Sequence, residues 1–183
     1  ETGGTSGWRN NVISNSTNQR YRVTNQGLQL IQDNMGRRSM VDPATLADFI
    51  KYAKANYPAD RYMLVMWDHG GGSLTGYGYD QNFKNDSMTL DELAVALKNG
   101  GCTFDVIGFD ACLMATLETA MVLEPYADYM VASEETEPGI GWYYTGWLSA
   151  LAQNSSMATT DLGKRLIDDY VANCKSQTPQ SQA

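Results

Sequence analysis

Histidine, cysteine and long apolar runs are all scarce in this chain of 183 residues. His69 is the single histidine, and no apolar stretch approaches the length of a membrane span. The three cysteines, Cys102, Cys112 and Cys174, are too few and too scattered for a disulfide scaffold or a zinc site with paired ligands. Basic residues are outnumbered, 13 against 21 acidic, and the formal net charge of −8 argues against nucleic acid and anionic membrane surfaces as partners.

What remains is the composition of an ordinary globular domain. The hydrophobic share is 43%, and the length suits one domain over residues 1–183. Residues 1–7 read as a loop, whereas an α/β domain rarely starts on its own loop. We therefore expect a fragment or processed piece of a longer protein, whose upstream strands, and any downstream segments, are its natural partners.

Two hydrophobic runs read as buried strands, and each is followed by a reactive side chain. The run at 62–67 precedes His69, and the run at 104–109 precedes Cys112. In an open parallel sheet, ligands and chemistry collect beyond the carboxyl ends of the strands. If the two strands are neighbours, an imidazole and a thiol face one crevice, which is the minimum for covalent acyl transfer.

The residues around this pair support the same chemistry. An imidazole serves as general base or acid, and the glycine at Gly70 leaves a backbone N–H open to a developing oxyanion. Cys112 stands at the start of a predicted helix, whose dipole favours the thiolate and whose first N–H groups, its own included, are unpaired. Taken alone, Cys112 is equally well a small buried hydrophobe and His69 a turn residue. Their shared position at two strand ends favours catalysis.

Strands and helices alternate along the rest of the chain. The pattern predicts a hairpin from 20–23 and 28–31, a strand at 129–132 and a final helix at 161–173. Helices are further predicted after Asp42-Pro43, after the capping box of Thr89 and Glu92, and after Cys112 with an apolar face of Leu113, Leu117, Ala120 and Met121. Loops are expected at 70–87 and 133–147. Alternation of this kind predicts an α/β fold, a mostly parallel sheet with helices on both faces.

Two segments resemble the catalytic blocks of a known family. Residues 66–72 (MWDHGGG) and 108–114 (GFDACLM) are similar to those of the clostripain family of cysteine peptidases, in the caspase-like clan with gingipains, legumain, separase and caspases. The likeness extends through 132–139 and covers most of the chain. It implies a caspase-like α/β sandwich, incomplete at the N-terminus here because family members have strands before the region where this sequence begins.

The resemblance also implies an activity and a set of roles. The expected function is that of a cysteine endopeptidase, cutting protein or peptide substrates after Arg or Lys. Cys112 is then the nucleophile, His69 the proton carrier, and the N–H groups of Gly70 and Cys112 the oxyanion hole. We expect a bacterial enzyme that is secreted or at the cell surface.

Recognition of a basic residue requires an anion in the first pocket. Asp110 precedes Cys112 by two residues, which places both side chains on one face of an extended strand. Its carboxylate suits a guanidinium or an ammonium group, and an aspartate here has that role in the family. The plainer interpretation is a hydrogen bond that shapes the strand-to-helix turn. Glu135 is a further candidate through its charge, and Trp142 either lies along the stem of a bound Arg or Lys or is ordinary packing.

The loop after His69 holds a second candidate feature. Lys84-Asn85 is the only bond after a basic residue between Gly70 and Ser87, and several family members cut themselves between the histidine and the cysteine. It is therefore the self-cleavage candidate, with a solvated lysine as the plainer interpretation. Calcium could bind carboxylates at Asp80, Asp86 and Asp91, but their spacing does not match an EF-hand. We assign no metal and expect no required cofactor.

One rival function comes from another class. The acidic and aromatic loop 133–147 offers carboxylates and an aromatic platform that suit a carbohydrate-active or sugar-binding domain. That interpretation leaves the two strand-end motifs unexplained.

Overall fold

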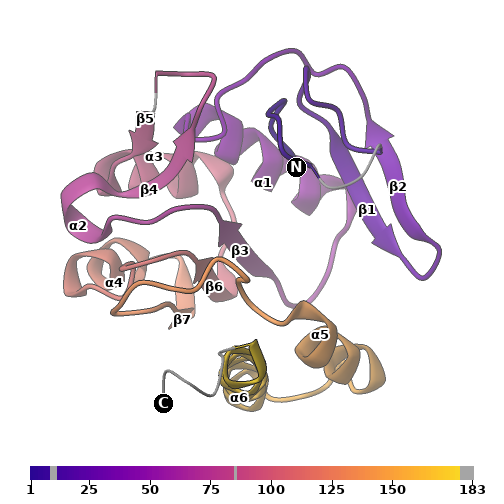
Figure 1. Ribbon diagram of the computed structural model, residues 1–183, viewed down its shortest axis with the longest axis vertical. Helices are drawn as coiled ribbons and strands as arrows, with labels where there is room; N and C mark the ends of the chain where they lie inside the picture. The colour runs from indigo at the N-terminus through magenta and orange to yellow at the C-terminus, as the bar shows by residue number, and fades with distance from the viewer. Residues whose placement is uncertain (9–11, 85, 178–183) are drawn as a thin grey trace.

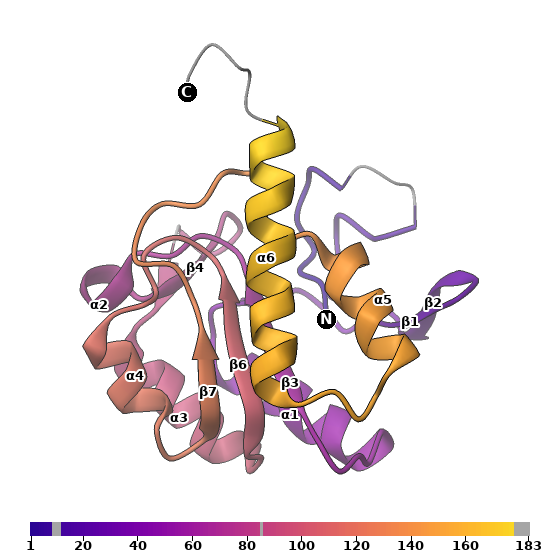
Figure 2. The same cartoon turned by 90° about the horizontal axis from the view of Figure 1, so that it is seen from below.

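A three-stranded parallel sheet forms the middle layer of the computed structural model, which describes residues 1–8, 12–84 and 86–177 (Figure 1). The strands are ordered β3 (Met63–Trp67), β6 (Phe104–Asp110) and β7 (Ala127–Val131), and both pairings are parallel. Helices cover both faces, as Figure 2 shows. The first face carries α1 (Pro43–Asn56), α3 (Leu90–Gly100) and α4 (Leu117–Leu123), and the second carries α5 (Tyr144–Gln153) and α6 (Thr159–Gln177). The predicted α/β class is confirmed.

The alternation of side chains along β3 explains the two layers of helices. Leu64 and Met66 point into a core shared with α1 and α3, where both are almost fully buried. Met63 and Val65 point to the opposite face and pack against a second core under α5 and α6. Successive side chains of a strand face opposite sides of the sheet, so an unbroken apolar run needs cover on both.

Side-chain caps start the helices of the first face at the predicted residues. The Asp42 carboxylate accepts from the Ala44 N–H at 2.8 Å, ahead of Pro43 in the first turn of α1. Thr89 and Glu92 form the expected capping box on α3. The hairpin of β1 (Arg20–Thr24) and β2 (Gly27–Gln32) is also confirmed, as a separate antiparallel sheet. Within the described ranges, no helix is long and apolar enough to cross a membrane.

The helix after Cys112 differs from the prediction. A turn follows Cys112, and α4 begins only at Leu117 because the Thr116 hydroxyl accepts from the Thr119 N–H and caps it. This phase turns Thr119 and Leu123 inward and leaves Leu117 and Met121 exposed, at 73% and 68%. The predicted apolar face was therefore wrong, and so was the argument that a helix dipole acts directly on Cys112.

Two predicted loops also contain regular structure. The segment after His69 forms α2 (Gly72–Thr75) and an antiparallel hairpin of β4 (Tyr77–Asp80) and β5 (Asp86–Met88). The second segment, 133–147, already begins α5 at Tyr144. Backbone hydrogen bonds order the segment after His69. The Gly71 N–H donates to the Gly76 carbonyl and the Gly78 N–H donates to the His69 carbonyl, both at 2.8 Å.

Gly70 lets the two strand-end loops approach one another. A Cβ at this position would lie 2.1 Å from the carbonyl oxygen of Cys112, which no side chain can tolerate without movement of the backbone. Glycine is therefore required next to His69 to bring the loop after β3 onto the loop after β6.

We predict that Gly70→Ala destabilises the fold by about 1–3 kcal/mol, the usual cost of overpacking. Gly139→Ala is the matched control, because a Cβ there would meet nothing within 4 Å. Urea unfolding followed by tryptophan fluorescence measures both variants. Equal stability of the two would show that the loops do not depend on this approach.

Candidate active site

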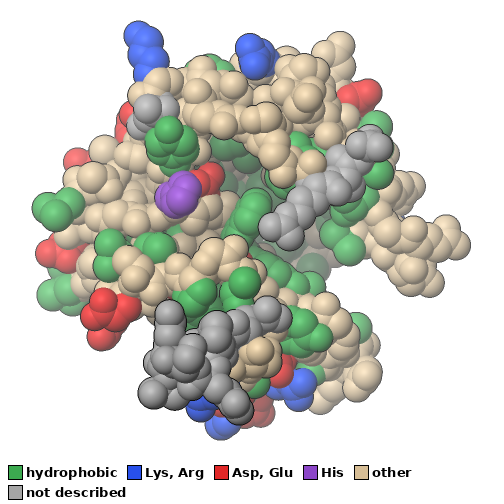
Figure 3. Space-filling view, in the orientation of Figure 1, with side chains coloured by type: hydrophobic (Ala, Val, Ile, Leu, Met, Phe, Trp, Pro, Cys, Tyr) green, Lys and Arg blue, Asp and Glu red, His purple; other side chains and the backbone are tan. Residues whose placement is uncertain are grey.

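The carboxyl ends of β3 and β6 lie side by side. Trp67 and Asp110 are register partners, so His69 and Cys112 each follow the last paired residue by two positions on adjacent strands. A cavity of about 380 Å³ opens there, and both residues line it. Figure 3 shows a hollow at the centre of this face, with the single histidine, in purple, near its edge. The sequence prediction that the two strands are neighbours is confirmed.

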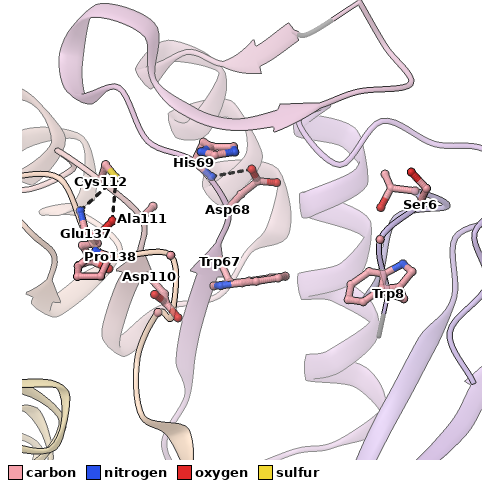
Figure 4. A pocket seen from close by; sticks show the side chains of 14 residues that line it. Ser6, Trp8, Trp67, Asp68, His69, Asp110, Ala111, Cys112, Glu137 and Pro138 are labelled. Carbon is pink, nitrogen blue, oxygen red and sulfur yellow. Dashed lines mark hydrogen bonds between the residues drawn. The ribbon is translucent and has the colours of Figure 1, made fainter. Parts of the chain in front are cut away.

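Cys112 is partly exposed, and the loop that follows β7 holds its thiol. The Glu137 N–H donates to Sγ at 3.2 Å, and Sγ lies 3.9 Å from the Glu137 carbonyl oxygen (Figure 4). In the described structure, neither the Cys112 nor the Gly70 backbone N–H donates a hydrogen bond to another residue. The Cys112 N–H is thus an unused donor on the residue that carries the thiol, and the Gly70 N–H is an unused donor on the loop that approaches the Cys112 backbone.

His69 lies on a separate loop from Cys112 and is exposed to solvent. Its ring meets Tyr79 edge-on, with centroids 5.8 Å apart, and its backbone N–H donates to Asp68 Oδ1 at 2.6 Å. Figure 4 shows its side chain and that of Cys112 on different loops around the same cavity. The imidazole and the thiol form no hydrogen bond with each other in the described structure.

Asp110 lies at the base of the cavity and is only 3% exposed. Its carboxylate accepts from the Trp142 N–H, at 3.1 and 3.2 Å to the two oxygens, and from the Tyr144 hydroxyl at 2.8 Å. Burial, together with the Asp110 charge, raises the pKa of Tyr144. Asp110 thus lines the cavity, and its hydrogen bonds hold the distant loop at Trp142 and the start of α5, not the turn that follows its own strand.

The structure does not bring Trp142 and Glu135 into the cavity. The indole of Trp142 is 5% exposed and packs onto Gly108, where a Cβ would lie 2.7 Å from the ring. Only its backbone N–H turns toward Asp110. Glu135 is exposed, and its carbonyl fastens the loop by accepting from the Leu113 N–H at 3.1 Å.

The same burial removes the support for a sugar platform in 133–147. Trp142 and Trp147 are 5% and 3% exposed because they form the second core with Leu162 and Leu166. A stacking platform requires exposed ring faces, and these two rings are covered.

Glu137 is a cavity residue that the sequence interpretation did not select. Its Oε2 is buried and has no hydrogen-bond partner among the described residues. Burial, followed by repulsion from Asp110, raises the pKa of Glu137 to about 7. The Glu137-Pro138-Gly139 sequence could have indicated a turn that brings Glu137 toward the cavity. Pro138 turns the chain back, and its carbonyl accepts from the Gly141 N–H.

Two aromatic residues of the cavity wall were also missed. Trp8 and Trp67 both line it, with ring centroids 6.5 Å apart and planes at 40°. Trp67 was noted only as the last residue of a buried run, yet it is 60% exposed at the end of β3. Nothing in the sequence linked it to Trp8.

Lys84 and the aspartates of the β4–β5 hairpin do not line this cavity. Lys84 is exposed in the turn between the strands, with a φ of 60°, and Asn85 lies outside the described residues. Asp80 is 2% exposed and accepts from the backbone N–H groups of Met40 and Asn82. Among residues 1–8, 12–84 and 86–177, no three carboxylate, histidine or cysteine side chains are grouped as metal ligands would be.

Comparison with known proteins agrees with this arrangement. The clostripain family matches residues 10–183. Clostripain from Hathewaya histolytica is 35% identical over 124 residues, which are 58% of this chain and 23% of clostripain. The chain thus spans about a quarter of that curated relative.

Solved structures share the fold. One is a secreted cysteine protease from Bacteroides thetaiotaomicron in complex with an irreversible peptide inhibitor, 27% identical with a TM-score of 0.74 over 88% of this chain and 46% of that one. An inactive zymogen protease from Parabacteroides distasonis, 22% identical, has a TM-score of 0.69 over 90% and 46% and supports the caspase-like fold alone. This chain belongs to the clostripain family.

Proposed function

We propose that this chain carries the catalytic residues of a cysteine endopeptidase that cuts after Arg or Lys. The observation that supports it most is the cavity at the ends of β3 and β6, which is lined by Cys112, His69 and the buried carboxylate of Asp110. Covalent acyl transfer needs a nucleophile, a proton carrier and a place for the oxyanion within one site. All three are available around this cavity.

In the proposed reaction His69 removes the thiol proton, and Cys112 Sγ attacks the carbonyl carbon of the scissile bond. The resulting oxyanion accepts from the N–H groups of Gly70 and Cys112, which bond nothing else in the described structure. His69 then protonates the leaving amine and afterwards activates the water that hydrolyses the thioester. The Glu137 N–H, at 3.2 Å, stabilises negative charge on sulfur.

The dyad is open in the free protein, because His69 lies against Tyr79 and not on the thiol. Catalytic hydrogen bonds are often long or absent without substrate and form in the Michaelis complex. A bound peptide would occupy the space between the two loops, so we expect substrate binding to complete the alignment.

The negative charge of the protein and the description of a relative support the proposed substrate class and location. Asp110 places a negative charge beside the thiol, within a protein whose net charge is −8. Long-range attraction then favours cationic peptides. The solved relative from Bacteroides thetaiotaomicron is described as secreted and as holding a peptide inhibitor. We extend both properties to this chain as a bacterial, secreted or cell-surface enzyme.

The first test removes the dyad. Cys112→Ala should lower kcat/KM for small Arg or Lys peptide substrates by a factor on the order of 10⁴ or more, because the nucleophile is lost. His69→Ala should lower it roughly 10²–10⁴-fold. Cys102→Ala is the control, because that thiol is buried in the first core. Near-normal turnover by Cys112→Ala would end the cysteine-peptidase proposal.

Asp110→Asn tests the specificity pocket. We expect the preference for Arg over an uncharged side chain to fall by about 3–5 kcal/mol, because a buried charge opposite the substrate cation is lost. Thermal stability should fall as well, because the amide NH2 replaces one of the two oxygens that accept from the Trp142 N–H and the charge is lost. Parallel measurement of kcat/KM for Arg, Lys and neutral substrates decides it. An equal fall for all three would assign Asp110 to structure only.

Self-processing after Lys84 is the remaining prediction. A protease binds its substrate extended, whereas Lys84 sits in a left-handed turn between β4 and β5, so the hairpin must open first. We expect slow nicking of the active protein, seen by intact mass, and none in Cys112→Ala. Lys98, in the last turn of α3, should remain uncut. Peptide turnover without any fragment ending at Lys84 would contradict self-processing at this bond.

A further inference from the structure

Three carboxylates line the cavity, those of Asp68, Asp110 and Glu137, and within the described residues no cation pairs with any of them. Figure 4 shows Cys112, Glu137 and Asp110 along the same side of the opening. Two like charges in a partly desolvated site are unfavourable unless a proton or a cation is shared between them.

The hydrogen bonds of the two carboxylates are distributed unequally. Both oxygens of Asp110 already accept, from the Trp142 N–H and the Tyr144 hydroxyl. Gly141 closes over the same group, because a Cβ there would lie 3.0 Å from Asp110 Oδ1. Two donors thus use part of the acceptor capacity of Asp110, which leaves fewer positions for the several N–H groups of a guanidinium.

Glu137 keeps one carboxylate oxygen without a partner, although its side chain also interacts with those of Trp142 and Asp110. Its Oε2 is buried and unpartnered within the described chain, although a buried carboxylate oxygen normally has a donor. Its backbone is fixed on the nucleophile, with the N–H 3.2 Å from Cys112 Sγ. The Glu137 carboxylate is thus tied to the reacting sulfur by its own backbone.

We propose that Glu137 is the second specificity residue of this pocket, and that its carboxylate, backed by the charge of Asp110, receives the guanidinium or ammonium group of the substrate. The proposal rests on the peptidase function above and deepens it. Below a pH of about 7, a proton occupies the place of that cation in the free protein. When the substrate enters, the Glu137 carboxyl releases this proton to solvent and its two oxygens accept from the substrate's N–H groups.

This exchange makes recognition depend on pH. Burial and the Asp110 charge raise the pKa of Glu137 to about 7, and the other titratable groups facing it are Cys112, Tyr144 and Tyr170. Below that value Glu137 is protonated and must lose its proton to bind a cation, so KM for a basic substrate rises as the pH falls through about 7. The two tyrosines have raised pKa values through burial and stay neutral in this range.

The same pKa predicts an effect on stability that does not require substrate. The folded protein binds this proton more tightly than the unfolded chain, whose Glu has a pKa of about 4.3. Stability contributed by the group is therefore present at low pH and lost as the pH rises from the unfolded value to about 7. Glu137→Gln should remove this loss and raise Tm at pH 8 relative to wild type, with little change near pH 4.

The deciding experiment measures kcat/KM from pH 5.5 to 8.5 for two peptides that differ only in Arg or norleucine before the scissile bond. Wild type, Glu137→Gln and Glu137→Asp are compared with Glu134→Gln, which removes the same charge from an exposed position of the same loop. Alkylation of the thiol by iodoacetamide reports whether the nucleophile is intact in each protein.

We expect Glu137→Gln to lower kcat/KM for the Arg peptide about tenfold to a hundredfold at pH 8, the loss expected for hydrogen bonds to a charged group. Norleucine turnover and the alkylation rate should change little. The rise in KM near pH 7 should disappear, Glu137→Asp should restore part of the Arg preference, and Glu134→Gln should resemble wild type.

Failure of this proposal and failure of the proposed function give different results. If no cleavage depends on Cys112 in wild type, the peptidase function is wrong. If Cys112-dependent cleavage is normal while Glu137→Gln keeps the Arg preference and the pH profile, Glu137 is not a specificity residue and Asp110 acts alone. An equal fall for Arg and norleucine peptides with slower alkylation would make Glu137 a support of the thiol only.

Discussion

The buried carboxylate of Asp110 is the group on which the rest of the site depends. A charge that is 3% exposed must be satisfied by hydrogen bonds, and here the donors come from the Trp142 backbone and from Tyr144 at the start of α5. One side chain at the end of β6 thereby positions the loop from Glu137 to Trp142 and the first turn of the helix that covers the second face. The loop in turn carries the N–H that contacts the nucleophile. The charge proposed for specificity, the position of the thiol and the packing of α5 are consequently coupled. A change at Asp110 cannot affect one of them alone.

Close backbone approach is the second constraint, and it places glycine where side chains would be expected. Gly70 admits the Cys112 carbonyl, and Gly108 admits the Trp142 indole against the middle of β6. The first approach joins the two reactive loops, and the second lets an aromatic core form directly on the sheet. Both glycines lie within segments that otherwise read as strand or strand end. Glycine costs backbone entropy on folding, but a methyl group would push the loops apart at Gly70 and would push Trp142 and α5 outward at Gly108.

Much of this arrangement was predictable because it follows from local rules. The runs before His69 and Cys112 fix strands, caps at Asp42 and Thr89 fix helix starts, and parallel strands bring their carboxyl ends together. The failures have a common cause in long-range contacts. Trp142 was left open between a pocket wall and ordinary packing, and it packs on Gly108, whereas Glu137 was not selected although it lines the cavity. A loop residue's burial depends on which partner it meets across the fold, and spacing along the chain carries no information on that.

These contacts divide the site into a part fixed by the sheet and a loop after β7 that is fastened at few points. Cys112 and His69, the proposed nucleophile and proton carrier, stand just beyond paired strands whose geometry is set by two cores. Glu137 lies on a loop that begins after β7 and is fastened by few backbone hydrogen bonds, among them the Leu113 N–H to the Glu135 carbonyl at 3.1 Å and the Ala115 N–H to the Ser133 carbonyl at 2.9 Å. A loop tied to a sheet at a few points tolerates substitution between those points better than the strands do. If Glu137 receives the substrate side chain as proposed, selection of the residue before the scissile bond is easier to alter than the chemistry, because Glu137 and its neighbours can change while β3, β6, Cys112 and His69 remain in place.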